Sequence, residues 1–325
     1  MSKTGGACFT PRMEPRPKYP SSLNIIQHTT REYLRDMIFG TVLVLALVPS
    51  YTALTQALVP RLGERIFFTI FGSIVHLGSF ALTALPLVIC DRMDWLKEYK
   101  IPRKPSQVAS SNLLRALFIE MTIGHFISTP ISLYLSYGLF KYFGMPSVMS
   151  EPSTSPIFLA WAFALAHFYN DVGFYWSHRL FHMPVLYKHI HKKHHNFVGT
   201  IAPAAEFAHI FEGLTANVIP TIAGILFFGR HCLIFWVWLA LRLQQTYEAH
   251  SGYCFQGTWF DFFLLTHGDG AVEHDHHHTI NRGNFGASWL DYLCGTMDSF
   301  VAAGGHATYL SLAHRAVYTA RGSDM

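Results

Sequence analysis

The hydrophobic residues of this chain are concentrated in long stretches separated by short polar segments. Four of these stretches, at about 37–59, 66–90, 113–143 and 157–176, are each long enough to cross a hydrocarbon core, which needs roughly 20 helical residues. Prolines and glycines inside them are tolerated in a membrane bundle. We therefore predict an all-α, multispan membrane helical bundle with about four spans.

A fifth apolar region, 216–243, is interrupted by Gly229, Arg230 and His231. Each half has only about a dozen residues, which is short for a full crossing of the bilayer. We therefore expect a re-entrant helical hairpin here. Such a hairpin leaves the polar segments on either side of it on the same face of the membrane.

The charges of the loops predict the orientation of the bundle. The N-terminal arm and the 91–115 segment are basic, whereas the 144–156 linker carries no Lys or Arg. Because cytosolic loops are rich in Lys and Arg, the first two segments are expected in the cytosol and the linker on the opposite side. The fourth span then returns the chain to the cytosol near residue 178.

The composition of the chain limits the classes of protein to which it can belong. Half of the residues are hydrophobic and 14% are charged, and the formal net charge of +4 is spread along the chain, so nucleic-acid binding is not expected. No signal peptide is expected, because the first residues are rich in proline and lack an apolar core. We divide the chain into a flexible cytosolic arm (1–36), membrane spans and loops (37–156), a catalytic domain (157–303) and a C-terminal tail (304–325).

Histidines are clustered in three short segments of the second half of the chain. The clustered residues are His178 and His182, then His191, His194 and His195, and finally His274, His277 and His278. Residues three or four apart share one face of a helix, so each segment is expected to aim its imidazoles in one direction. Imidazole suits iron, zinc, copper and nickel, and eight nitrogens are too many for one ion. The sequence therefore predicts a two-metal site in a cytosolic helical cap.

Several neighbouring residues are candidates for supporting roles. Asp171 lies two turns before His178 on one helix face and is expected to accept the imidazole N–H of that histidine. Asp171, Glu206 and Asp275 are the candidate catalytic, proton-relaying carboxylates, and Glu212 is a further one. The spacing places His189 and His276 off the ligand faces. The five cysteines are scattered and form no C-x-x-C pair, which argues against disulfides or a thiolate site and leaves Cys254 as an alternative ligand.

At this point the order of the motifs resembles a known family. The segments HRLFH, HKKHH, AEFAH, AHSGY and HDHHH, followed by Asn284-Phe-Gly and Asp291-Tyr-Leu-Cys-Gly-Thr, are similar to the fatty acid hydroxylase/sterol desaturase superfamily. The resemblance covers about 160–300 and is greatest to the C-4 methylsterol oxidase branch. The chain departs from that branch in having Ile210 after His209, and Gln256 shortly after the AHSGY motif, where relatives have proline.

This resemblance implies a multi-pass endoplasmic-reticulum enzyme with two iron ions and an active site that faces the cytosol. It adds His209 and His250 to the metal ligands. It also implies a sterol or lipid substrate from the bilayer, and electrons from NAD(P)H through cytochrome b5 and its reductase. The expected activity is C-4 methylsterol monooxygenation in sterol biosynthesis. Sterol side-chain hydroxylation, sterol desaturation and hydroxylation of long-chain aliphatic or sphingoid lipids stay open, as do a metal transporter and an inactive scaffold.

Overall fold

The computed structural model describes residues 22–148, 155–256, 258–263, 265–267 and 270–306. In these ranges the chain is helical, and it forms no strand beyond an isolated bridge between Lys100 and Tyr253. The expected all-α membrane bundle is confirmed. The expectations for 1–21, for the linker at 149–154 and for the tail at 307–325 lie outside the described residues.

Long helices form the apolar part of the molecule. They are α1 (Ser22–Leu62), α2 (Glu64–Ser79), α3 (Leu85–Arg92), α4 (Ser111–Ile123), α5 (Thr129–Tyr142) and α6 (Pro156–Phe181). Short π-helical turns, Phe80–Ala84 and Gly124–Ser128, join α2 to α3 and α4 to α5, so each pair is one continuous helix. Apolar side chains point outward from these helices, for example Leu82 at 82% and Leu135 at 71% exposure. That surface is suited to lipid rather than to water.

The hairpin at 216–243 is present, but its arms are longer than the sequence indicates. One arm runs through α8 (Ile210–Glu212), a π-helical turn (Gly213–Val218) and α9 (Ile219–Phe228), and the other is α10 (Cys232–Ala249). Among the described residues, five helical segments are long and apolar enough to cross a membrane, and Ile210–Phe228 is one of them. Gly224 allows α9 to contact α6 directly, because a Cβ there would lie 2.6 Å from the Cα of Ala166.

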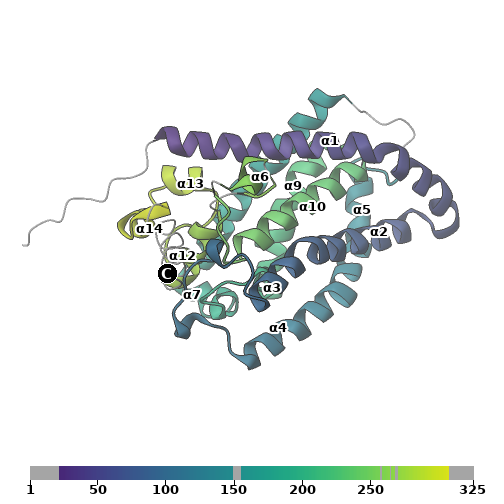
Figure 1. Ribbon diagram of the computed structural model, residues 1–325. Helices are drawn as coiled ribbons and strands as arrows, with labels where there is room; N and C mark the ends of the chain where they lie inside the picture. Colours follow the sequence, from purple (N-terminus) through teal and green to yellow (C-terminus); the bar gives the residue numbers. More distant parts are fainter. Residues whose placement is uncertain (1–21, 149–154, 257, 264, 268–269, 307–325) are drawn as a thin grey trace, which may run out of the picture.

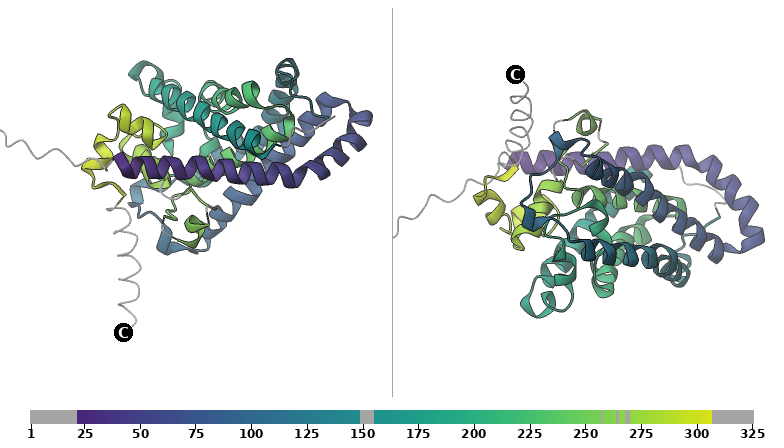
Figure 2. Two further views of the ribbon diagram at one scale, coloured as in Figure 1. Left: turned by 90° about the horizontal axis from the view of Figure 1, so that it is seen from above. Right: turned by 60° about the horizontal axis from the view of Figure 1, so that its bottom comes forward.

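The first helix begins earlier than expected, at Ser22, so 22–36 is not a loose arm. Its polar residues are buried against the second half of the chain: Asp36 Oδ2 lies 2.7 Å from His167 Nδ1, and Arg35 Nη1 lies 2.8 Å from His267 Nε2. The sequence did not indicate this because the partners are more than 130 residues away. α1 runs along the length of the molecule, from the end that carries α12, α13 and α14 to the long apolar helices (Figures 1 and 2).

Short helices gather at one end of the molecule, beside the beginning of α1 (Figure 1). They are α7 (Pro184–Tyr187), α11 (Trp259–Phe262), α12 (Gly270–Ile280), α13 (Ser288–Leu293) and α14 (Asp298–Ala302), with 3₁₀ turns at Lys97–Tyr99, Pro105–Gln107, His191–Asn196 and Ala202–Glu206. This end carries the three histidine segments. The chain thus has an apolar bundle with a polar helical cap, as the sequence predicts.

Candidate metal centre

Four local structures carry the clustered histidines. His178 lies in the last turn of α6, and His182 caps that helix. His191, His194 and His195 lie on the 3₁₀ turn His191–Asn196, and the third segment lies on α12. His250 caps the C-terminal end of α10. Helices distant in sequence therefore present imidazoles to one region.

Nine of the ten histidines expected as ligands form two groups. Within each group, one ligand atom of every histidine lies within 4.8 Å of those of the others. The five-histidine group contains His178, His182, His191, His195 and His277. The four-histidine group contains His194, His250, His274 and His278. The two groups are neighbours: the rings of His195 and His278 are stacked with centroids 4.5 Å apart. Two adjacent groups of nitrogen donors fit a pair of metal ions.

The membership of the groups differs from the expectation that each segment points in one direction. Each pair with four-residue spacing stays together, namely His178 with His182, His191 with His195, and His274 with His278. The third histidine of each longer segment lies in the other group. His194 joins the group formed by α12 and α10, and His277 joins the group formed by α6. On α12, adjacent residues point about 100° apart, so His277 and His278 cannot share a target.

The ring orientations are those of metal ligands. His178 Nδ1 donates to Phe285 O at 2.6 Å, His277 Nδ1 to Gly283 O at 2.6 Å, and His278 Nδ1 to Phe197 O at 2.9 Å. A hydrogen bond from one ring nitrogen fixes the tautomer and leaves the other nitrogen as an acceptor. The Nε2 atoms therefore point into the groups with free lone pairs.

In the pair formed by His194 and His250, two nitrogen lone pairs point toward each other. Both Nδ1 atoms donate to backbone carbonyls, those of Phe207 and Thr246, at 3.3 and 2.8 Å. Their two Nε2 atoms nevertheless face each other at 3.2 Å. Neither nitrogen carries a hydrogen, so the two lone pairs repel each other unless a cation lies between them. The donor set thus fits a bound metal ion.

The protonation of the groups agrees with this assignment. Burial lowers the pKa of His194 to about 4 and the pKa of His277 to about 3. Burial, aided by neighbouring imidazoles, also holds the pKa of His250 well below its usual value. These imidazoles are therefore neutral near pH 7, and neutral imidazole is the form that binds metals.

A carboxylate contacts one of the clustered histidines from behind. Glu212 Oε1 lies 2.8 Å from His191 Nδ1, and both side chains are buried. Such a carboxylate orients the imidazole and makes it a stronger donor. Of the candidate carboxylates, Glu212 is the one that contacts a clustered histidine.

Asp171 does not accept from His178, contrary to the expectation. Seven residues of helix rise by about 10 Å, which is too far for that hydrogen bond. Asp171 Oδ2 instead accepts from Trp289 Nε1 at 2.9 Å and from the Tyr33 hydroxyl at 3.2 Å. The helix places both residues on one face, but not within reach of each other.

The structure places the other two carboxylate candidates away from both groups. Asp275 forms an ion pair with Arg103 at 2.9 Å and accepts from the Thr200 hydroxyl at 3.1 Å, so it ties α12 to two loops. Glu206 accepts from the Tyr247 hydroxyl and faces His125. Neither is directed at the clustered histidines.

The other histidines considered as ligands lie outside the two groups. His209 lies outside both groups, and its Nδ1 accepts from the backbone N–H of Phe211 at 3.2 Å, which caps α8. His189 is exposed, and His276 lies 3.3 Å from the Ser299 hydroxyl, so both are outside the groups, as the spacing predicts. Cys254 packs in a hydrophobic cluster with Ile101 and Val272.

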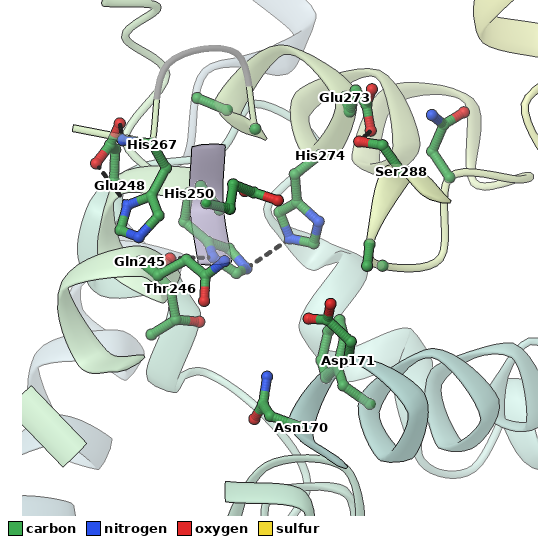
Figure 3. A pocket seen from close by; sticks show the side chains of 18 of the residues that line it. Asn170, Asp171, Gln245, Thr246, Glu248, His250, His267, Glu273, His274 and Ser288 are labelled. Carbon is green, nitrogen blue, oxygen red and sulfur yellow. Dashed lines mark hydrogen bonds and ion pairs between the residues drawn. The ribbon is translucent and has the colours of Figure 1, made fainter. Parts of the chain in front are cut away.

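A small cavity of about 100 Å³ adjoins the four-histidine group (Figure 3). His250 and His274 line it, and Asp171 lines it from α6. Arg242 and Thr246 also line this cavity and, at the same time, a larger apolar cavity of about 710 Å³ between α2, α5, α9 and α10. The two cavities therefore share Arg242 and Thr246 as lining residues.

Comparison with known proteins gives the family. Residues 163–296 match the fatty acid hydroxylase family model, and this range includes every histidine of the two groups. The chain belongs to the fatty acid hydroxylase superfamily, whose members are membrane-embedded oxidoreductases that act on lipids. It is accordingly a multi-pass membrane protein.

Two kinds of relative are found. The chain is 32% identical to methylsterol monooxygenase 2-2 of Arabidopsis thaliana over 248 residues, which are 74% of this chain and 90% of the plant protein. It is 31% identical to a very-long-chain aldehyde decarbonylase of Oryza sativa over 247 residues, which are 74% of this chain and 89% of the rice protein. No solved structure matches the chain significantly.

Proposed function

We propose that this chain is a di-iron, dioxygen-dependent monooxygenase that oxidises a methyl group at C-4 of a sterol. The observation that carries the proposal is the pair of adjacent all-nitrogen groups, in which lone pairs such as those of His194 and His250 converge at 3.2 Å. Imidazole is a suitable ligand for iron, and iron activates dioxygen. The similarity to methylsterol monooxygenase 2-2 favours the sterol as substrate.

The nine histidines would hold the two ions, which together supply the activation of dioxygen for attack on an unactivated C–H bond. The protein's own contribution is positioning. Backbone carbonyls of Phe285, Gly283 and Phe197 orient the rings from behind, so the donor atoms are fixed before substrate arrives. Because all nine histidines are buried or half-buried, bulk water is largely kept from the site.

The substrate route in this proposal is the apolar cavity of about 710 Å³. It is lined by apolar side chains of α5 and α9, including Leu135 and Ile219, which are partly exposed on the lipid-facing surface. A flat apolar molecule would enter from the bilayer and place its reacting carbon past Arg242 and Thr246, toward His250 and His274. Holding that one carbon near the metals selects the bond that is oxidised.

Asp171 is the carboxylate we assign to proton handling. It lines the cavity beside His250 and His274 and is held by Trp289 and Tyr33. We further propose that electrons come from NAD(P)H through cytochrome b5 and its reductase, and that the protein resides in the endoplasmic reticulum with the cap in the cytosol. The basic 91–115 segment favours that orientation.

The experiment compares oxygen-dependent turnover in microsomes that carry the parent chain or His194→Ala. With C-4-methylated sterols and NADPH, the parent is expected to form oxidised sterol, and the variant is expected to form none. Equal turnover by both would end the enzymatic proposal.

Aldehyde decarbonylation is a second candidate, because the rice relative bears that name. The same microsomes are therefore given a very-long-chain aldehyde. Hydrocarbon product from the parent, without sterol oxidation, would replace the sterol proposal and keep the metal centre. Sterol side-chain hydroxylation, sterol desaturation and long-chain hydroxylation are separated in the same assays by the position and kind of the product.

A further inference from the structure

A third cluster of metal-binding side chains lies apart from the two histidine groups. His76 comes from α2, His125 from the π-helical turn Gly124–Ser128, and Glu206 from the 3₁₀ turn Ala202–Glu206. One ligand atom of each lies within 4.8 Å of the others. The sequence left both histidines unassigned, because they have no partner at helical spacing. Their position inside apolar stretches was the available signal, since ionisable residues in spans are expensive and usually functional.

The contact between the two imidazoles has the same length as the contacts in the metal centre. His76 Nδ1 and His125 Nδ1 are 3.0 Å apart. In the two groups, facing Nε2 atoms are separated by 2.8 Å for His250 and His274 and by 3.2 Å for His194 and His250. Two nitrogens that each lie 2.0–2.1 Å from one zinc ion come about this close to each other.

The carboxylate of Glu206 completes the donor set. Its Oε1 accepts from the Tyr247 hydroxyl, while its Oε2 lies 3.5 Å from His125 Nε2. Among the described residues, His125 is its one ion-pair partner, and no Lys or Arg side chain balances the charge. The side chains of His125 and Glu206 are only 5% and 16% exposed. A carboxyl group in such surroundings favours its neutral form unless a cation is bound beside it.

His125 can bind the ion through Nδ1, the nitrogen that faces His76. Its other nitrogen, Nε2, is buried, makes no hydrogen bond and lies 3.5 Å from Glu206 Oε2. The residue sits within a π-helical turn, which inserts an extra residue into the helix and often marks a functional site. The turn interrupts an otherwise regular α4–α5 helix at the height of His76 and Glu206. Its effect is to direct His125 to this cluster.

We propose that His76, His125 and Glu206 bind a third metal ion, a single divalent transition-metal ion with the properties of Zn²⁺. Two imidazoles and one carboxylate are a known zinc donor set, and a fourth position stays free for water. The ion joins α2, the π-helical turn and the 3₁₀ turn Ala202–Glu206. It lies at the boundary of two apolar cavities, since His76 lines the cavity of about 710 Å³ and His125 lines one of about 870 Å³.

The test counts metal ions per chain in the full-length protein, purified in detergent from zinc-supplemented cells without a chelating resin. His76→Ala and Glu206→Gln are each expected to lose one ion relative to the parent, and His189→Ala, which removes an exposed histidine, is expected to lose none. An equal count in the parent and in both folded cluster variants would overturn the third site. Loss of turnover is not a readout here, so the result stands whether or not the sterol proposal holds.

Anomalous scattering at the zinc edge keeps the proposal testable if both cluster variants fail to fold. Crystals of the zinc-loaded parent are expected to show a peak between His76 and Glu206. No peak at this position, with peaks present in the histidine groups, would overturn the proposal. Thermal unfolding gives a third readout. The parent and Glu206→Gln are both treated with chelator and then measured with added Zn²⁺. Only the parent is expected to gain stability from this site.

Discussion

His194 and His250 lie 56 residues apart in the chain, yet their Nε2 atoms face each other at 3.2 Å, and each ring donates its only N–H to a backbone carbonyl. This arrangement is unfavourable without a cation and favourable with one. The 3₁₀ turn that carries His194 and the end of α10 that carries His250 are therefore expected to be held together by the metal.

Replacing His194 is expected to affect metal content and turnover together. His194→Ala removes one of four donors from its group and should lower oxygen-dependent turnover by more than about 100-fold, because even residues that only support ligands often cost 10–100-fold. Metal per chain and product formation are measured on the same preparation. His189→Ala serves as the control, because that side chain is exposed and outside the groups. Full iron content in His194→Ala would contradict the assignment.

Removing the charge behind His191 is expected to weaken the five-histidine group without abolishing it. Glu212→Gln should lower metal affinity about 10–100-fold, since the carboxylate at 2.8 Å orients the ring and raises its basicity. Competition with a soluble chelator measures the loss. Glu120→Gln is the control, because Glu120 pairs with Lys193 at 2.7 Å where both are about one-third exposed, and such pairs contribute little. Equal retention of metal by the two variants would exclude this role for Glu212.

Filling the apolar cavity is expected to block substrate and leave the metals in place. Ser132 lines the cavity of about 710 Å³, so Ser132→Trp should raise KM at least about 10-fold by occupying the proposed route. Val108→Trp places the same ring in the cavity of about 870 Å³ and should change KM little. Metal content is measured in both. The opposite ranking of the two variants would move the substrate route to the second cavity.

Asp291 is expected to make stability depend on pH. It is fully buried and accepts from Phe285 N at 2.9 Å, Gly286 N at 3.1 Å and the Thr296 hydroxyl at 2.6 Å. Burial raises its pKa from 3.8 to about 7. The folded state therefore holds a proton that the unfolded state releases. The contribution of this proton to the stability of the folded state is complete below about pH 4 and is lost as the pH rises through 7.

The measurable consequence is a difference between the parent and Asp291→Asn. From about pH 6 to about pH 8, the parent should lose about 1 kcal/mol of stability relative to the variant, whose side chain does not titrate. Thermal unfolding in detergent across this range measures the difference. A gap between the two that stays constant with pH would show that Asp291 keeps an ordinary pKa in the folded protein.

Much of the architecture could be read from local features of the chain. The long apolar stretches predict the spans, and Gly229 to His231 predicts the break in the hairpin, because these effects depend on neighbouring residues. The helix at 22–36 could not be read in this way. Its polar residues Arg35 and Asp36 look like those of a solvated arm, and only their partners His267 and His167 reveal that they are buried.

The sequence by itself determined the chemistry: histidines at three- and four-residue spacing supply neutral nitrogens, and four-residue pairs such as His274 and His278 remain on one side of a helix by its geometry. The tertiary structure alone decided which histidines lie in one group. His194 and His277 exchange groups, His209 stays outside, and Glu212 rather than Asp171 supports a ligand. Spacing fixes direction within one helix, but the packing of α6, α10 and α12 determines which directions meet.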